Sequence, residues 1–324
     1  MGIAQRTMKL FILGLFINKA DNWSDWRIPG VLQALSAAYL IVSVADWGLS
    51  RRPGRSFSQN HVSKFVGWHF VFGVIPLILV NLLITFTLPV PGFPTGYIGP
   101  GGLADGGEYR NCTGGAHLYV DSLVFEIQHL LQTPTCQQRY KTGPYDPEGL
   151  LNWLMVATTA YAGYLQGALF MIIQELSTTP AAEVQNRHTR HLVVCGSGLV
   201  LLSVLGGGLW VFPSGPWIPL NKNLWSLSYV LLSSGLAAWL LALLVKLIDG
   251  AESVKWSGAV CVAVGRNSIS IYVMVLYPSV VFRVTGTSVA SANLSFALRI
   301  ARSVSTLCPI CANTSERWRR SAPF

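Results

Sequence analysis

Long uncharged apolar stretches alternate with short polar segments along the chain. Crossing the hydrocarbon core of a membrane takes roughly 20 helical residues. Six stretches without Asp, Glu, Lys or Arg approach or exceed that length, at residues 28–45, 65–90, 149–174, 192–213, 223–245 and 267–282. The sixth is expected to begin upstream, near Trp256. We predict a membrane-spanning helix in each of them.

A seventh span is predicted at the start of the chain. Residues 10–18 are apolar but too few alone, so residues 1–9 must complete the helix. The long side chains of Arg6 and Lys9 would then reach back to the lipid–water boundary. The pattern predicts an all-α fold: a polytopic membrane helix bundle of about seven transmembrane helices with a long lumenal loop at residues 91–148.

The composition agrees with lipid as the main solvent of the chain. Hydrophobic residues make up 51% of the 324 positions and charged residues only 11%, which excludes a soluble globular domain. The formal net charge of +9 comes from basic residues that form no single patch or stripe. We therefore expect membrane lipid, and no nucleic acid, as a partner.

The basic residues set the expected orientation. Loops 51–64, 175–191 and 246–255 hold eight Lys and Arg residues, whereas the short opposite loops hold only Lys19, Arg27 and Lys222. Because cytosolic loops are enriched in Lys and Arg, the first group is assigned to the cytosol. The N-terminus of the chain is then cytosolic, and residues 91–148 are lumenal.

The lumenal segment carries three features that fit its compartment. Asn111-Cys112-Thr113 is a glycosylation sequon. Cys112 and Cys136 share the segment with no other cysteine, and we expect a disulfide between them because the compartment is oxidising. Dense Pro and Gly residues predict a series of turns. Composition leaves open whether this cap only shields the bundle or carries function.

Four stretches resemble one enzyme family. They are LPVPGFPTGYIGPGGLADGGEYRNCTGGAHLYVD at residues 88–121, YDPEGLL at 145–151, RIPGVLQ at 27–33 and NKNLWSLSY at 221–229. Together with Asn267-Ser268-Ile269 they resemble, in the same order, the heparan-alpha-glucosaminide N-acetyltransferases. The resemblance covers roughly residues 5–273.

The resemblance implies a lysosomal membrane protein that transfers an acetyl group from cytosolic acetyl-CoA to the terminal glucosamine amine of heparan sulfate. It implies no metal, and it leaves a homo-oligomer open. The amine is protonated in an acidic lumen, so the reaction needs a general base or a nucleophile that carries the acetyl group. The developing oxyanion also needs hydrogen-bond donors.

The catalytic residue is unknown, because the family histidine implied by the resemblance has no counterpart upstream of Arg27. A second departure is Met274-Val275-Leu276, where the family has Gly-His-Glu. We expect a partial form that does not acetylate glucosamine by itself. The six histidines are expected in cytosolic loops (His61, His188, His191), near the end of a span (His69) or in the lumenal cap (His117, His129).

The candidate binding residues come from the spans and their lumenal ends. Spacing by three and four residues predicts that Asn223, Ser226, Tyr229 and Ser233 form a polar stripe on one face of the helix expected at residues 223–245. Such a stripe lines a cavity or hydrogen-bonds a neighbouring helix. Arg27 and Lys222 could position a sulfate or simply reach to the interface. Asp146 and Glu148 could attract the protonated amine or charge the first turn of the next helix. The full set is Arg27, Gln33, Asp146, Glu148, Lys222, Asn223, Ser226, Tyr229, Ser233 and Asn267.

The last 40 residues do not continue the bundle pattern. Residues 284–324 are Ser-rich and interrupted by Arg, so we predict an irregular or disordered tail after an acetyltransferase-like domain at residues 1–283. The lone pair Cys308 and Cys311 has no second ligand pair, so no zinc site is expected. Two other functions stay open: an inactive membrane scaffold and, less favoured because no internal repeat is seen, a small-solute transporter.

Overall fold

The computed structural model describes residues 2–18, 23–49, 59–176, 181–208, 218–248, 259–268 and 271–272. The chain forms two units, residues 1–252 and 253–324, and the second is described only around α10, Ala259–Arg266. Several predictions lie outside the described residues: the last span beyond residue 272, the boundary at 283, the tail, Met274 to Leu276, and the pair Cys308 and Cys311.

The all-α prediction is confirmed, since no strand occurs in the described part of the chain. Five helical segments there are long and apolar enough to cross a membrane, which confirms a multi-pass bundle. They are α2 (Val31–Leu49), α3 (Gln59–His69) joined to α4 (Ile75–Thr87), α7 (Leu150–Leu176), α8 (Ala181–Ser203) and α9 (Leu227–Ile248). Helix α1, Ile3–Ile17, is shorter, and the total of seven remains a prediction.

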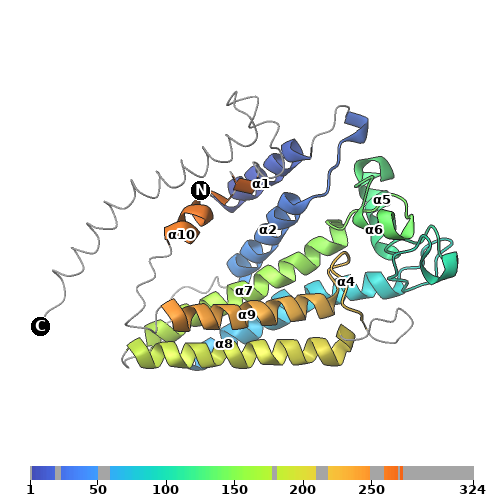
Figure 1. Ribbon diagram of the computed structural model, residues 1–324. Coiled ribbons are helices and arrows are strands. Elements are labelled where there is room, and N and C mark those ends of the chain that lie inside the picture. Colours follow the sequence, from blue (N-terminus) through green and yellow to red (C-terminus); the bar gives the residue numbers. More distant parts are fainter. Residues whose placement is uncertain are drawn as a thin grey trace, which may run out of the picture. The chain divides into compact units, whose positions relative to one another are not determined.

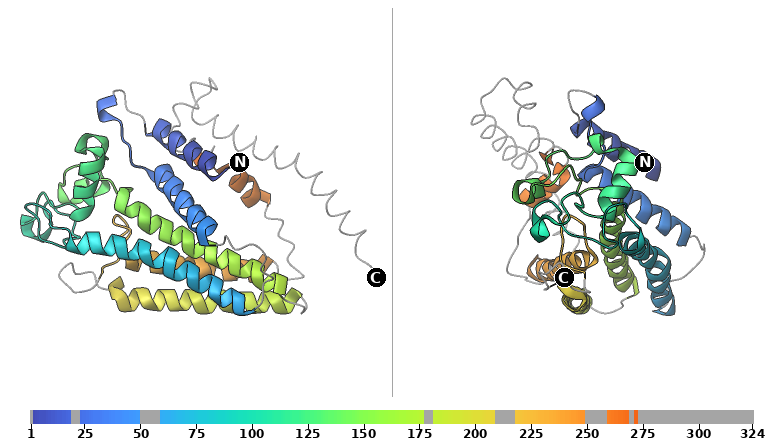
Figure 2. Two further views of the ribbon diagram at one scale, coloured as in Figure 1. Left: turned by 180° about the vertical axis from the view of Figure 1, so that it is seen from behind. Right: turned by 90° about the vertical axis from the view of Figure 1, so that its right-hand side faces the viewer.

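Helices α4, α7, α8 and α9 of the first unit lie side by side in all views (Figure 1, Figure 2). Helices α8 and α9 form the most extensive pair, and α2 links α1 to α7. Gly196 and Gly235 let the α8 and α9 backbones meet, because a Cβ on either would lie within 3.0 Å of the other's carbonyl oxygen. Small residues at such contacts are typical of helix packing in membranes.

A π-helical segment, Phe70–Val74, joins α3 to α4. Pro76 is the second residue after it, in the first turn of α4. A proline within a helix removes one backbone donor and crowds the carbonyl four residues earlier, which favours a wider turn. Gly73 in this segment packs on Tyr161 of α7, whose hydroxyl lies 2.7 Å from Nδ1 of the buried His69. The wide turn thus brings α3 and α4 against α7.

The cap, residues 91–148, folds at the end of the bundle where α4 ends and α7 begins (Figure 1). It contains helices α5 (Ala116–Phe125) and α6 (Thr135–Tyr140) and the 3-10 turns Ala104–Gly107 and Ile127–His129. A further 3-10 turn, Trp23–Asp25, lies between α1 and α2, and a π-helical segment, Val204–Gly208, ends α8. Gly102 and Gly115 have positive φ, and a Cβ at either would lie 2.0 Å from a backbone oxygen. Only glycine fits these tight turns.

The predicted disulfide in the cap is wrong, because both cysteines are free thiols. The buried Cys112 thiol lies 3.9 Å from the Gly92 carbonyl oxygen, whereas Cys136 on α6 lies 3.3 Å from the Thr142 hydroxyl. Each sulfur is thus held against a different part of the cap. Burial also raises the pKa of the Cys112 thiol.

Three histidines that were expected in cytosolic loops lie in helices instead. His61 belongs to α3, and His188 and His191 belong to α8, which begins eleven residues before the predicted span at 192. Glu, Gln and Arg are good helix formers, so charged residues extend the helix beyond its apolar part. Hydropathy alone does not report that extension.

Candidate functional site

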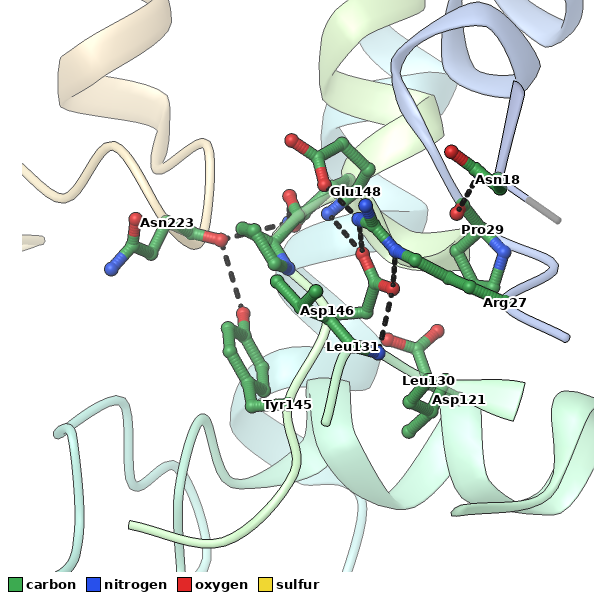
Figure 3. A network of polar contacts seen from close by, with 12 residues as sticks. Asn18, Arg27, Pro29, Asp121, Leu130, Leu131, Tyr145, Asp146, Glu148 and Asn223 are labelled. Atoms are coloured by element: carbon green, nitrogen blue, oxygen red, sulfur yellow. Dashed lines mark hydrogen bonds and ion pairs between the residues drawn. The ribbon is translucent and has the colours of Figure 1, made fainter. Parts of the chain in front are cut away.

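An ion network joins the segment before α2 to the segment before α7 (Figure 3). Arg27 Nε donates to Asp146 Oδ2 at 2.7 Å, and Nη2 donates to Asp146 Oδ1 at 2.6 Å and also to Glu148. Asp146 is fully buried. Burial disfavours the guanidinium charge, but the hydrogen bonds and charges of the two carboxylates outweigh it and raise the pKa of Arg27.

Three of the predicted binding residues take part in the ion network: Arg27, Asp146 and Glu148. Asp146 also accepts hydrogen bonds from the backbone N–H groups of Leu131 at 3.1 Å and Glu148 at 3.0 Å. Its four lone-pair positions are therefore in use within the protein. Burial raises the pKa of Glu148 in spite of the neighbouring Arg27. This geometry favours tying the cap to the bundle over capture of an amine or a sulfate.

Two buried titratable side chains lie one turn apart on α5. Asp121 Oδ1 accepts a hydrogen bond from the Leu150 N–H at 2.7 Å, at the start of α7, and burial raises its pKa to about 7. His117 Nε2 lies 3.2 Å from the Thr85 hydroxyl, and burial lowers its pKa to about 4. Gly149 makes room for Asp121, since a Cβ there would lie 1.8 Å from Oδ2.

The turn before α9 is fastened to the start of α7. The Asn223 carbonyl oxygen accepts hydrogen bonds from the Tyr145 hydroxyl at 3.0 Å and from Asn152 Nδ2 at 2.9 Å. Burial, with the charges of Asp121 and Asp146 adding to it, raises the pKa of Tyr145, so the hydroxyl keeps its proton. Trp225 follows with a φ of 45°, a left-handed conformation that an L-residue adopts only when its surroundings impose it.

The predicted polar stripe divides at this turn, because the chain becomes helical only at Leu227. Ser226 is the N-cap of α9: its hydroxyl accepts a hydrogen bond from the Tyr229 N–H at 3.3 Å and another from the Asn221 N–H at 3.0 Å. The expected single face formed by all four residues is therefore wrong. Only Tyr229 and Ser233 lie together on the helix.

A cavity of about 600 Å³ lies among α7, α8 and α9. Trp225 lines its end nearest the cap. His188, near the start of α8, and Val245, near the end of α9, line the opposite end. Most of the lining is apolar. The polar side chains in it are Thr159, Gln166, His188, Tyr229, Ser233 and Ser234.

Three polar atoms of this lining are buried without a hydrogen-bond partner in the described part of the chain: Gln166 Oε1, His188 Nδ1 and Ser234 Oγ. His188 itself is only 3% exposed. Buried polar atoms in proteins nearly always have a partner, in the protein or in bound molecules. The three atoms therefore give this cavity hydrogen-bonding groups that the described side chains leave unused.

The remaining predicted residues are not brought to the cavity. Gln33 is fully buried on α2 against Gly14 and Gly30, and neither atom of its amide has a partner among the described residues. Lys222 is exposed beside Asn223, and Asn267 is exposed after α10 in the second unit. Neither cap histidine, His117 or His129, lines the cavity.

Comparison with known proteins supports the resemblance seen in the sequence. No family model matches the chain. It is 34% identical over 290 residues to heparan-alpha-glucosaminide N-acetyltransferase of Homo sapiens and 32% identical over 287 residues to the enzyme of the same name from Mus musculus. Each match covers 84% of this chain but only 41% of the relative, so the chain spans less than half the length of these relatives.

Proposed function

We propose that this chain, similar over most of its length to two N-acetyltransferases, is the donor-binding part of a membrane enzyme. The enzyme transfers the acetyl group of acetyl-CoA to the terminal glucosamine amine of heparan sulfate. The reaction and its acceptor come from the name of the relatives. The observation that carries the proposal is the cavity among α7, α8 and α9 with its unpartnered polar atoms.

The cavity suits the pantetheine arm of acetyl-CoA. That arm is narrow and mostly apolar, and its two amides and thioester carry several donors and acceptors. His188 Nδ1 and Ser234 Oγ can each donate or accept, and Gln166 Oε1 accepts. Tyr229, near the cap end, offers a hydroxyl that could donate to the thioester oxygen as negative charge develops on it.

In the proposed reaction the amine nitrogen attacks the thioester carbonyl carbon and the carbon–sulfur bond breaks. Coenzyme A leaves as a thiol, and the ammonium proton passes to a base. His117 is buried against Thr85, and His129 Nδ1 lies 2.8 Å from the Trp26 carbonyl oxygen. Because these contacts hold both cap histidines away from the cavity, neither is placed to act as the base. We therefore expect slow turnover by the chain alone.

The proposed orientation places the cap in the lumen of the lysosome and the connection between α7 and α8 in the cytosol. Arg187, Arg190 and Lys246 lie at that end of α8 and α9, and their side chains are exposed. Asn111 is exposed on the cap, where a glycosyltransferase could reach it. Acetyl-CoA would thus enter from the cytosol and deliver its acetyl group towards the cap.

The test is equilibrium binding of radiolabelled acetyl-CoA to the chain in lipid nanodiscs. A glucosamine-terminated heparan tetrasaccharide is then added and acetylated product is measured separately. We expect saturable donor binding, weakened by Tyr229→Phe. Product should form about 10²- to 10⁴-fold more slowly than with a positioned general base. Absence of saturable binding would contradict the proposal and favour an inactive scaffold.

A further inference from the structure

A second hollow, of about 670 Å³, opens between the cap and the loop before α9. Thr135, Cys136, Arg139 and Tyr140 of α6 line it on one side, and Asn221 and Asn223 line it on the other. We propose that this cleft binds the acceptor, the non-reducing end of an anionic, amine-bearing saccharide. The inference rests on the proposed function and assigns the acceptor to residues outside the donor cavity.

The charge of the cleft favours an anionic ligand. None of the described residues that line it is acidic, and Arg139 is exposed with its guanidinium 5.7 Å from the centre of the Tyr140 ring. No carboxylate in the described part of the chain pairs with Arg139. Its planar donors are therefore available to a sulfate or carboxylate, which guanidinium groups bind through paired hydrogen bonds.

The cleft also has the polar groups that a sugar requires. The Thr135 hydroxyl and the Asn223 amide offer donors and acceptors for ring hydroxyls. Figure 3 shows the Asn223 side chain directed away from Tyr145, while its backbone carbonyl is held by that residue and by Asn152. The amide can thus serve a ligand without disturbing the turn.

One turn of the chain separates the acceptor cleft from the donor cavity. Asn221 and Asn223 line the cleft, whereas Trp225, two residues further on, lines the cavity. The hydrogen bonds from Tyr145 and Asn152 fix this turn between the two hollows. An acceptor held by Arg139 would therefore present its terminal sugar to the cap end of the cavity, where the acetyl group is proposed to lie.

The experiment compares Arg139→Gln with Arg110→Gln, an equivalent change at an exposed arginine of the same cap that does not line the cleft. The probe is a sulfated heparan tetrasaccharide with a terminal glucosamine, titrated against the chain in nanodiscs of uncharged lipid. Arg139→Gln should weaken binding about three- to tenfold, as expected for one exposed charge-assisted contact. Asn223→Ala should also weaken it, and Arg110→Gln should change it less than twofold.

A tetrasaccharide that is both desulfated and carboxyl-reduced separates direct contact from a change of structure. With this probe the wild type and Arg139→Gln should bind alike, because the sulfate and carboxylate groups that Arg139 could contact are gone. Equal weakening by Arg110→Gln, an Arg139 effect that persists with this probe, or no saccharide binding by the wild type would each overturn the assignment. Acetyl-CoA binding, measured in the same nanodiscs, reports separately on the proposed function.

Discussion

Replacing Arg27 by Met is expected to destabilise the first unit strongly. The change keeps the apolar stem and removes the cation that faces Asp146 and Glu148. Asp146 is fully buried, and removal of one partner from a buried ion pair typically costs about 3–5 kcal/mol. Asp146 keeps two backbone N–H donors, and Arg27 is 22% exposed, so we expect the lower end, about 3 kcal/mol.

The assay is thermal unfolding in detergent, followed by size-exclusion chromatography of heated samples. Because unfolding of membrane proteins is commonly irreversible, one heating rate must be used for every variant. A loss of about 3 kcal/mol corresponds to roughly 6–12 °C in apparent Tm for a unit of this size. Arg110→Met, at an exposed site, is the matched control and should lower the apparent Tm by no more than about 2 °C.

A double variant tests whether the buried charge causes the loss. Asp146→Asn neutralises the carboxylate with little change of shape. The double variant Arg27→Met with Asp146→Asn should therefore lose less free energy of unfolding than the sum of the losses of the two single variants. We expect a coupling of at least about 1 kcal/mol. Two results would show that the ion network does not hold the cap to the bundle. One is an equal apparent Tm for Arg27→Met and Arg110→Met. The other is a double variant whose loss of stability equals the sum of the losses of Arg27→Met and Asp146→Asn.

Three further predictions address the cap and the turn. Because burial raises the pKa of Asp121 from 3.8 to about 7, the folded protein keeps a proton that the unfolded chain releases, and stability falls as pH rises through that interval. The stability of Asp121→Asn relative to wild type should therefore grow between pH 5 and pH 7, and a constant difference would refute this. Ser226→Ala should cost about 1 kcal/mol of stability because the N-cap is lost, and this should lower the apparent Tm. The affinity for acetyl-CoA should not change; a weaker affinity would show that Ser226 belongs to the donor site. Asn111→Gln should remove a glycan mass from protein made in a secretory-pathway host, and an unglycosylated wild type would reverse the proposed orientation.

The transmembrane helices were predictable because their signal is local. The stretch 149–174 matches α7, Leu150–Leu176, within two residues at each end. The stretch 223–245 begins four residues before α9, because an apolar pattern does not distinguish a tight turn capped by Ser226 from the helix it precedes. Local hydropathy therefore predicts where the helices occur, but it predicts the residues at which they begin and end poorly.

The contacts of the site could not be predicted, because they join distant parts of the chain. Arg27 and Asp146 are 119 residues apart, and the sequence motifs that contain them give no sign of pairing. Asp121 was missed altogether, since a Pro- and Gly-rich loop gives no sign of a helix that buries one of its carboxylates. The disulfide failed for the related reason that sharing a loop does not bring Cys112 and Cys136 together.

The central claim is that the cavity among α7, α8 and α9 holds the acetyl donor, and filling that cavity tests it most directly. Gly167 lines the cavity and has open space around its Cα, so Gly167→Leu should occupy the cavity without disturbing the helix contacts. Binding of radiolabelled acetyl-CoA to the two proteins in nanodiscs is the measurement. The account predicts saturable binding by the wild type and a loss of at least tenfold in affinity for an equally stable Gly167→Leu. Equal affinity of the two proteins would contradict it.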